Sequence, residues 1–147
     1  MISLLVADES HTPVVAALLA GLFEDVEHNL GFEELLDIFP DIDADDHHST
    51  LLALNEDGDA VGVITIAECL SLSAGGRYGV INELYVVPDY RSAGVGKMLM
   101  DFAKEIGDQR DWARIEVTTP GDAFDKTLRF YEREGFVKIG PRYKFVF

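Results

Sequence analysis

Cysteine is nearly missing from this sequence, because Cys69 is its single instance. One cysteine excludes a disulfide framework within the chain and a cysteine-rich zinc site. Basic residues are scarce as well: 12 Lys and Arg stand against 27 Asp and Glu, for a formal net charge of −15 at pH 7. Because an acidic surface repels phosphate backbones, we expect no nucleic-acid partner. The charge favours cationic small molecules or basic partners, or simply keeps the protein soluble.

The sequence also lacks a long hydrophobic run. Its longest apolar stretch, residues 14–23, has ten residues and is too short to cross a bilayer as a helix. Residues 1–8 carry no basic leader, so we expect no signal peptide. These absences predict that the protein has no membrane partner and is cytoplasmic.

What is present predicts a packed core in a single domain, residues 1–147, since 48% of the residues are hydrophobic and 10% aromatic. Pro40 is expected to end the second helix and Gly107 to cap the third. The predicted elements are a strand at 3–7, helices at 12–28 and 32–39, strands at 50–54, 60–70 and 78–87, a helix at 92–106, a strand at 112–119, a turn at 120–121, a helix at 122–134, and a terminal hairpin of strands at 137–139 and 143–147.

This order of elements predicts the fold class. Three consecutive strands joined by short turns favour antiparallel pairing, whereas the strand–helix–strand stretch at 78–119 favours a parallel crossover beside them. The expected fold is α+β, an αβα sandwich with a mixed, mostly antiparallel sheet of six to seven strands flanked by helices.

A glycine-rich loop lies between the strand at 78–87 and the following helix. Glycines allow close approach of the backbone to a ligand, and a helix N-terminus offers N–H groups and a positive dipole end to an anion. The Rossmann pattern requires glycine where Leu99 stands, and the phosphate loop of nucleotide hydrolases requires Ser or Thr where Met98 stands. Nucleotide binding is therefore the least favoured functional hypothesis. The structural alternative is that the loop is a tight turn that binds no ligand. The loop reads Arg91, Ser92, Ala93, Gly94, Val95, Gly96 and Lys97.

Two segments resemble motifs of the GCN5-related N-acetyltransferase (GNAT) family. Residues 81–99, INELYVVPDYRSAGVGKML, are similar to the family's acetyl-CoA motif, a Leu-Tyr-Val-x-Pro strand followed by Gln/Arg-x-x-Gly-x-Gly/Ala. Residues 128–136, LRFYEREGF, resemble its Phe-Tyr-x-x-x-Gly-Phe motif. The element order matches as well, so the resemblance covers essentially the whole chain and implies a GNAT-like acyl-CoA acyltransferase fold.

The resemblance implies an N-acetyltransferase that moves an acetyl group from acetyl-CoA to an amine by direct attack, without a covalent enzyme intermediate. The backbone of Leu84, Tyr85 and Val86 would pair with the pantetheine arm, and the N–H of Val86 would face the thioester oxygen. Arg91 and the backbone N–H groups of Ser92, Ala93, Gly94, Val95, Gly96 and Lys97 would hold the pyrophosphate. A domain that binds acyl-CoA without turnover, as a sensor or partner module, is the alternative.

The catalytic candidates are a tyrosine and two glutamates. Tyr131 matches the family's general-acid tyrosine, although its stripe with Phe124 and Leu128 is also typical of a core aromatic. Glu83 and Glu116 are carboxylates in apolar strands, where a raised pKa would suit a general base, and a solvated or ion-paired carboxylate is the alternative. We favour Glu83 because it lies on the cofactor strand. Many relatives have Asn where Phe124 stands, and a cofactor contact there is not predicted.

The acceptor amine carries no motif. In the GNAT family the segment between the second helix and the second strand often borders the acceptor site, so the resemblance implies this place for residues 41–46, which are predicted to lie in a charged loop. Their aspartates could then attract a cationic amine such as a polyamine, an aminoglycoside or a basic peptide end. The same segment fails the calcium-loop pattern, and we predict no metal site. Small members of the family are often dimers, so the resemblance is compatible with a homodimer, but the sequence does not define the oligomeric state.

Overall fold

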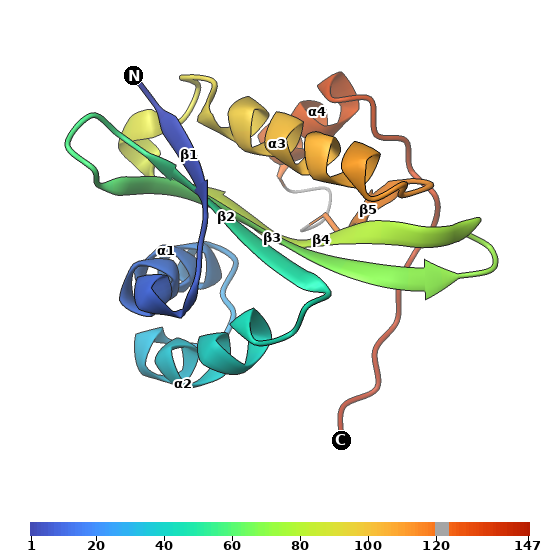
Figure 1. The fold of residues 1–147 in the computed structure, drawn as a ribbon, viewed down its shortest axis with the longest axis horizontal. Helices are drawn as coiled ribbons and strands as arrows, with labels where there is room; N and C mark the ends of the chain where they lie inside the picture. Colours follow the sequence, from blue (N-terminus) through green and yellow to red (C-terminus); the bar gives the residue numbers. More distant parts are fainter. Residues whose placement is uncertain (120–123) are drawn as a thin grey trace. The chain divides into compact units, whose positions relative to one another are not determined.

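The computed structural model describes residues 1–119 and 124–147. Two compact units make up the chain, Met1–Val117 and Thr118–Phe147. The first unit holds the sheet and three α-helices, and the second holds one helix, α4 (Asp125–Arg133). Both units are drawn in Figure 1.

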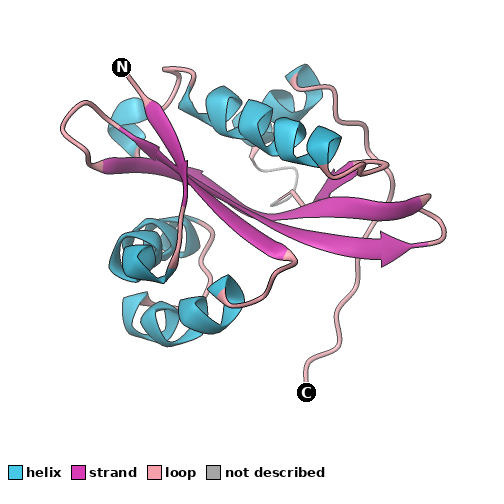
Figure 2. Cartoon of the chain, in the orientation of Figure 1, coloured by secondary structure: helices cyan, strands magenta, loops and turns pink. Residues whose placement is uncertain are grey.

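The first unit is built on one mixed sheet of five strands (Figure 2). The spatial order follows the chain order, with antiparallel pairing from β1 to β4 and parallel pairing between β4 and β5. This confirms the mixed, mostly antiparallel sheet and the parallel crossover, but the predicted number of six to seven strands is wrong for the described residues. The strands are β1 (Ser3–Val6), β2 (His48–Leu54), β3 (Ala60–Ser71), β4 (Gly76–Val86) and β5 (Ile115–Val117).

Helices cover both faces of this sheet, as predicted. In Figure 1, α1 (Thr12–Asp25) and α2 (Phe32–Asp43) lie below the sheet, and α3 (Val95–Gln109) lies above it. Two short 3-10 helices, η1 (Glu9–His11) and η2 (Pro88–Tyr90), precede α1 and α3. We call the two sides of the sheet the α1–α2 face and the α3 face. No described helix is both long enough and apolar enough to cross a membrane.

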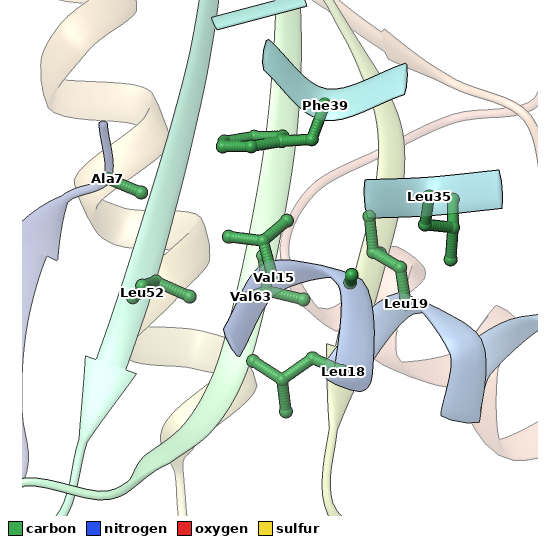
Figure 3. Packing of buried hydrophobic residues seen from close by; sticks show 9 residues of the cluster. Ala7, Val15, Leu18, Leu19, Leu35, Phe39, Leu52 and Val63 are labelled. Carbon is green, nitrogen blue, oxygen red and sulfur yellow. The ribbon is translucent and has the colours of Figure 1, made fainter. Parts of the chain in front are cut away.

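Each face has its own apolar packing. On the α1–α2 face, the helices press Val15, Leu19 and Phe39 against Leu52 and Val63 of the sheet (Figure 3). On the α3 face, the helix approaches so closely that a Cβ added at Gly62 would lie 3.0 Å from side-chain atoms of both Val95 and Leu99. Burial of a large aliphatic side chain stabilises the fold by about 1.5–3 kcal/mol, so these two layers fix the helices on the sheet.

The predicted terminal hairpin is wrong, because residues 134–147 contain no strand. Alternating apolar residues predicted one, but a strand exists only where its backbone groups are paired. Pro141 has no N–H to donate, and Gly140 has a φ of 141°, outside the φ range of regular β-strands. The side chains of Val137 and Phe145 are each 82% exposed. The predicted turn at 120–121 and the start of the helix predicted at 122–134 lie outside the described residues.

Pro40 does not end α2, which continues to Asp43. A proline inside a helix removes one N–H and usually costs about 3 kcal/mol. Here the turn after it still closes, because Ala44 donates its N–H to the Pro40 carbonyl at 3.1 Å. Burial of Phe39 against the sheet favours the same backbone path. Asp41 and Asp43 are therefore helical, and only the rest of the charged segment is a turn.

Candidate functional site

The open edge of β4 is the backbone feature of the site. β5 pairs only with Gly79–Ile81, whereas β4 runs on to Val86. Toward β3, Val87 donates its N–H to the Val61 carbonyl at 3.0 Å. Because antiparallel strands alternate the direction of their backbone groups, the N–H groups of Leu84 and Val86 point away from β3, toward the edge that β5 does not reach. The sequence predicted this segment to pair with an extended ligand.

A β-bulge at Asn82 decides where Glu83 points. In the β3–β4 pairing, Ile81 stands opposite Ile66, but Glu83 stands opposite Thr65, so Asn82 is the extra residue. Opposite residues share a face, and adjacent residues of β3 alternate between faces. The bulge therefore puts Glu83 on the face opposite to that of Ile81, where plain alternation would have kept them together. Glu83 lies with Thr65 on the α1–α2 face.

The half-buried Glu83 carboxylate has a defined set of neighbours. Its Oε1 accepts a hydrogen bond from the Thr65 hydroxyl at 2.5 Å, and its backbone N–H donates to the same hydroxyl oxygen at 3.0 Å. Burial raises the pKa of Glu83, while the bond from Thr65 and the charge of His28 act in the opposite direction. A carboxyl group with a raised pKa is better matched to proton transfer at neutral pH than an exposed one.

The loop before α3 has a backbone conformation that differs from that of the flanking elements. Ser92 and Gly94 both have left-handed backbone conformations, with φ of 63° and 85°. Such residues turn backbone N–H groups toward a common point. The first bond of α3 runs from the Met98 N–H to the Gly94 carbonyl at 3.0 Å, so the N–H groups of Val95 and Gly96 point out of the helix start. The sequence predicted that the backbone N–H groups of this loop bind a pyrophosphate, and that stays a prediction.

Arg91, the predicted partner of that anion, is held by three contacts. Its Nε donates to the Val86 carbonyl at 2.9 Å, and its Nη2 lies 3.1 Å from Oδ2 of Asp25 in α1. The guanidinium also stacks over the Tyr85 ring at 5.4 Å from the ring centroid. Lys97 contacts Asp101 at 3.4 Å. Both predicted cations thus have a carboxylate beside them in this structure.

The second base candidate, Glu116, is engaged by an arginine. Its Oε2 lies 2.7 Å from Nη2 of Arg114 and accepts a bond from Nε of the same residue at 2.8 Å. In the parallel pairing it stands beside Val80, not beside the open part of β4. The Glu116 carboxylate is therefore engaged in an ion pair with Arg114.

Tyr131 belongs to the second unit, on α4. The side chain is 8% exposed, and its ring makes edge-to-face contacts with Phe130 and Phe136 at centroid distances of 5.3 and 5.6 Å. Burial raises the pKa of the Tyr131 hydroxyl to about 12. The hydroxyl consequently keeps its proton at every physiological pH.

An acidic cavity of about 410 Å³ opens on the α1–α2 face. It includes Ala67, which is two residues from Thr65 and therefore on the same face of β3, about 7 Å along the strand. Burial lowers the pKa of His48 at its wall, and His48 Nδ1 has no hydrogen-bond partner among the described residues. No group of three or more potential metal ligands occurs in residues 1–119 and 124–147. The cavity is lined by Asp37, Ile38, Asp41, Ile42, Asp45, His47, His48, Ala67 and Glu68.

Sequence reasoning missed three residues of this region: Thr65, Asp25 and His28. Thr65 had a signal, because it is the one polar residue in the apolar run 61–67. A polar side chain in a buried strand requires a partner. Asp25 and His28 gave no comparable signal, since their neighbours Arg91 and Glu83 lie more than fifty residues away in the chain.

The sequence matches the family model described as "Acetyltransferase (GNAT) family" over residues 15–136. A curated relative, "Uncharacterized N-acetyltransferase YhfO" of Bacillus subtilis (strain 168), is 27% identical over 92 residues. That match covers 63% of this chain and 61% of the relative, which is less than two thirds of its length.

Solved structures share the fold at low identity. A ribosomal-protein-alanine N-acetyltransferase from Brucella melitensis biovar Abortus 2308 superposes with a TM-score of 0.80 at 20% identity, covering 100% of this chain and 99% of the other. The aminoglycoside N-acetyltransferase AAC(6')-Iy in complex with CoA superposes with a TM-score of 0.82 at 16% identity, covering 99% and 94%.

Proposed function

Because the chain belongs to the GNAT family of acetyltransferases, we propose that it moves an acetyl group from acetyl-CoA to an amine by direct attack. The observation that carries this proposal is the edge of β4 that β5 leaves unpaired, followed by the loop with left-handed residues before α3, with Glu83 on the same strand. When bound, acetyl-CoA supplies a thioester carbonyl that an amine can attack.

The backbone of this chain supports binding along that edge. The N–H groups of Leu84 and Val86 match an extended arm that adds to the strand, and the N–H of Val86 is placed to donate to a carbonyl oxygen as negative charge develops on it. The N–H groups at the start of α3 would hold the diphosphate, with Arg91 beside them. Such binding relies on main-chain N–H groups, which almost any side chain would preserve. In the loop before α3, the glycines therefore matter more than the other residues.

We assign the general base to Glu83. A primary amine has a pKa of about 10 and is mostly protonated at neutral pH, so a proton must leave before attack. Burial raises the pKa of Glu83, which brings its proton affinity closer to that of the amine. Glu116 is not favoured for this role because Arg114 pairs with it.

We assign the general acid to Tyr131. The leaving CoA thiolate has a pKa of about 8.5 and benefits from a proton donor. With a pKa of about 12, the Tyr131 hydroxyl is fully protonated at neutral pH and can donate. The family motif in residues 128–136 supports the same assignment.

The acceptor class we propose is a cationic amine. The acidic cavity on the α1–α2 face includes Ala67, which is the next residue after Thr65 on the same face of β3. Thr65 in turn contacts Glu83. Its aspartates would attract an ammonium group and its isoleucines would contact a hydrocarbon chain. A polyamine, an aminoglycoside and a peptide amine all fit this chemistry, and the solved relatives include enzymes named for the last two.

The test has two stages. Acetyl-CoA at about 100 times its Kd should raise the Tm by about 5–10 °C, since that ligand excess stabilises by about 2.7 kcal/mol; ATP and NAD should give no shift. Release of CoA thiol is then measured with spermidine, an aminoglycoside, an alanyl peptide and a neutral aromatic amine. Absence of an acetyl-CoA shift would contradict cofactor binding. A shift without turnover of any amine would favour a non-catalytic acyl-CoA-binding module.

A further inference from the structure

The hydroxyl of Thr65 is a buried polar group that makes two hydrogen bonds to Glu83. Thr65 is 2% exposed on the α1–α2 face of β3. It accepts the Glu83 backbone N–H at 3.0 Å and donates to Glu83 Oε1 at 2.5 Å. A hydroxyl has one proton, so accepting the N–H leaves its own O–H to be aimed at the carboxylate. Backbone and side chain of Glu83 are thereby held by a single atom.

The β-bulge explains why a side chain, and not a backbone carbonyl, accepts the Glu83 N–H. In a regular antiparallel pair, the residue opposite Glu83 would exchange backbone bonds with it. The extra residue Asn82 disrupts the ladder at this point, and the Thr65 hydroxyl takes the Glu83 N–H instead. A valine would fill the same volume without either bond. The structure therefore gives Thr65 a polar task that packing alone does not require.

The two oxygens of the Glu83 carboxylate are not equivalent. Oε1 is held by Thr65, whereas Oε2 has no hydrogen-bond partner among residues 1–119 and 124–147. Fixing one oxygen restricts the rotamer of the side chain and leaves the other as the proton acceptor. Of the described ionisable groups, His28 in the α1–α2 connection is the one whose charge acts on this carboxylate.

We propose that Thr65 is a positioning residue for catalysis, which holds the Glu83 carboxylate in the orientation and charge state that receive the proton of the acceptor amine. This proposal rests on the proposed function, with Glu83 as the base. Thr65 touches neither the amine nor the acetyl group. It acts through Glu83, by a bond that favours the ionised carboxylate and offsets part of its burial.

The experiment compares Thr65→Val, which keeps the volume, with Thr65→Ser, which keeps the hydroxyl. Thr50→Val is the matched control, because Thr50 is a buried threonine, 3% exposed, directly opposite Thr65 on β2. Two quantities are measured for each: the Glu83 titration midpoint by carboxyl-carbon NMR, assigned with Glu83→Gln, and the pH profile of kcat/KM with acetyl-CoA and the best amine of the panel. Thr65→Ala replaces Thr65→Val if the latter does not fold.

Thr65→Val should raise the titration midpoint of Glu83, move the acidic limb of the kcat/KM profile to higher pH by the same amount, and lower kcat/KM at pH 7 by about ten- to a hundredfold. Thr65→Ser should restore all three, and Thr50→Val should change none. In the Glu83→Gln background, Thr65→Val should have almost no further effect on kcat/KM, because its effect passes through Glu83.

An unmoved midpoint in Thr65→Val overturns the proposal, and so does a midpoint that moves while the kinetic limb stays. Full activity of Glu83→Gln also overturns it, and in addition removes Glu83 as the base in the proposed function. Failure of the proposal and failure of the proposed function can therefore be distinguished. If Glu83→Gln is inactive but Thr65→Val gives either of the first two results, Thr65 is not a positioning residue and Glu83 remains the assigned base.

Discussion

Arg91 is held by Asp25 at a position where the sequence predicted an anion contact. The two side chains are about half exposed, at 48% and 52%, and an exposed pair of this kind is worth about 0.2–1 kcal/mol. A diphosphate near the start of α3 would compete with Asp25 for the guanidinium. At the scale of single residues, Asp25 would therefore oppose cofactor binding by a small amount.

Asp25→Asn should tighten acetyl-CoA binding by about two- to fivefold, the factor that corresponds to the loss of such a pair. Isothermal titration calorimetry gives the Kd. Asp108→Asn, on an exposed position of α3, is the control, because it changes the net charge equally. Weaker binding by Asp25→Asn would mean instead that Asp25 orients Arg91 for the ligand, and equal gains in both variants would assign the effect to net charge.

Tyr131→Phe should lower kcat by about a hundredfold, since a positioned general acid typically contributes at least that factor. The Kd for acetyl-CoA should change by less than about twofold, because the aromatic packing of the ring is kept. Tyr143→Phe removes a hydroxyl from a tyrosine that is 96% exposed in the same unit, and should change neither quantity. An unchanged kcat in Tyr131→Phe would remove Tyr131 as the acid.

At this scale, local patterns in the sequence were enough to propose part of the candidate site. The loop at 91–97, Glu83 and Tyr131 stand in segments that resemble family motifs, and such motifs consist of neighbours in the chain. Thr65 and Asp25 were not predicted, because their partners come from other strands or helices. The orientation of Glu83 was not predicted either. The bulge at Asn82 moves Glu83 to the other face of the sheet, and no glycine or proline marks this bulge in the sequence.

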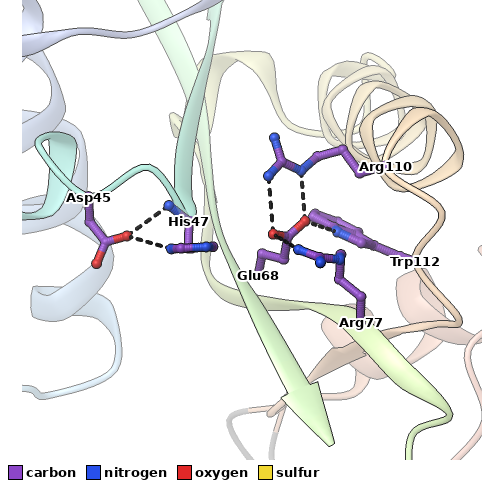
Figure 4. A network of polar contacts seen from close by, with 6 residues as sticks. All are labelled: Asp45, His47, Glu68, Arg77, Arg110 and Trp112. Atoms are coloured by element: carbon purple, nitrogen blue, oxygen red, sulfur yellow. Dashed lines mark hydrogen bonds and ion pairs between the residues drawn. The ribbon is translucent and has the colours of Figure 1, made fainter.

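At the scale of elements, one carboxylate ties the β3–β4 hairpin to the end of α3. Glu68, whose side chain is 3% exposed, accepts bonds from Arg110 Nε at 2.7 Å, Arg77 Nη1 at 3.0 Å and Trp112 Nε1 at 2.6 Å (Figure 4). Trp112 in turn packs so closely that a Cβ added at Gly107 would lie 2.9 Å from its ring. These bonds lower the pKa of Glu68 to about 2.

Glu68→Gln should reduce the free energy of unfolding by about 1–3 kcal/mol at pH 7, because three donors then face a neutral acceptor that cannot satisfy them equally. The sign of the pH dependence follows from the lowered pKa: the stabilisation by Glu68 is complete above the unfolded pKa of about 4.5 and declines as pH falls toward 2. Urea unfolding at pH 7 and pH 3 should therefore show a difference that shrinks in acid. Glu105→Gln, on an exposed face of α3, is the control, and a pH-independent difference would contradict the ion-pair account.

The boundaries of the helices show where local sequence rules did not predict the structure. The three internal strands, the crossover and the helices on both faces were predicted, because apolar periodicity and turn residues mark them. Pro40 and Gly107 were read as a stop and a cap, yet both lie inside helices: the turn after Pro40 closes, and Gly107 makes room for Trp112. Packing against residues that are distant in the sequence determines the backbone at Pro40 and Gly107. Local propensity carries no information about such packing.

At the scale of the whole molecule, the net charge of −15 acts on the two proposed substrates with opposite sign. A cationic amine would be attracted toward the acidic cavity, whereas the anionic acetyl-CoA would be repelled by the protein as a whole and would depend on local N–H groups and cations. Such long-range forces are screened beyond about 10 Å at 0.1 M salt, so added salt should weaken both effects.

Raising NaCl from about 20 mM to about 200 mM should therefore lower kcat/KM for a cationic amine by about three- to tenfold and leave a neutral amine within about twofold. The Kd of acetyl-CoA should fall or stay constant over the same range, because its repulsion is screened together with its local contacts. Asp41→Asn with Asp45→Asn should remove most of the salt effect on the amine, whereas Asp57→Asn with Asp108→Asn, outside the cavity, should keep it. Equal salt dependence for cationic and neutral amines would contradict a cationic acceptor and leave the acidic residues with a role in solubility alone.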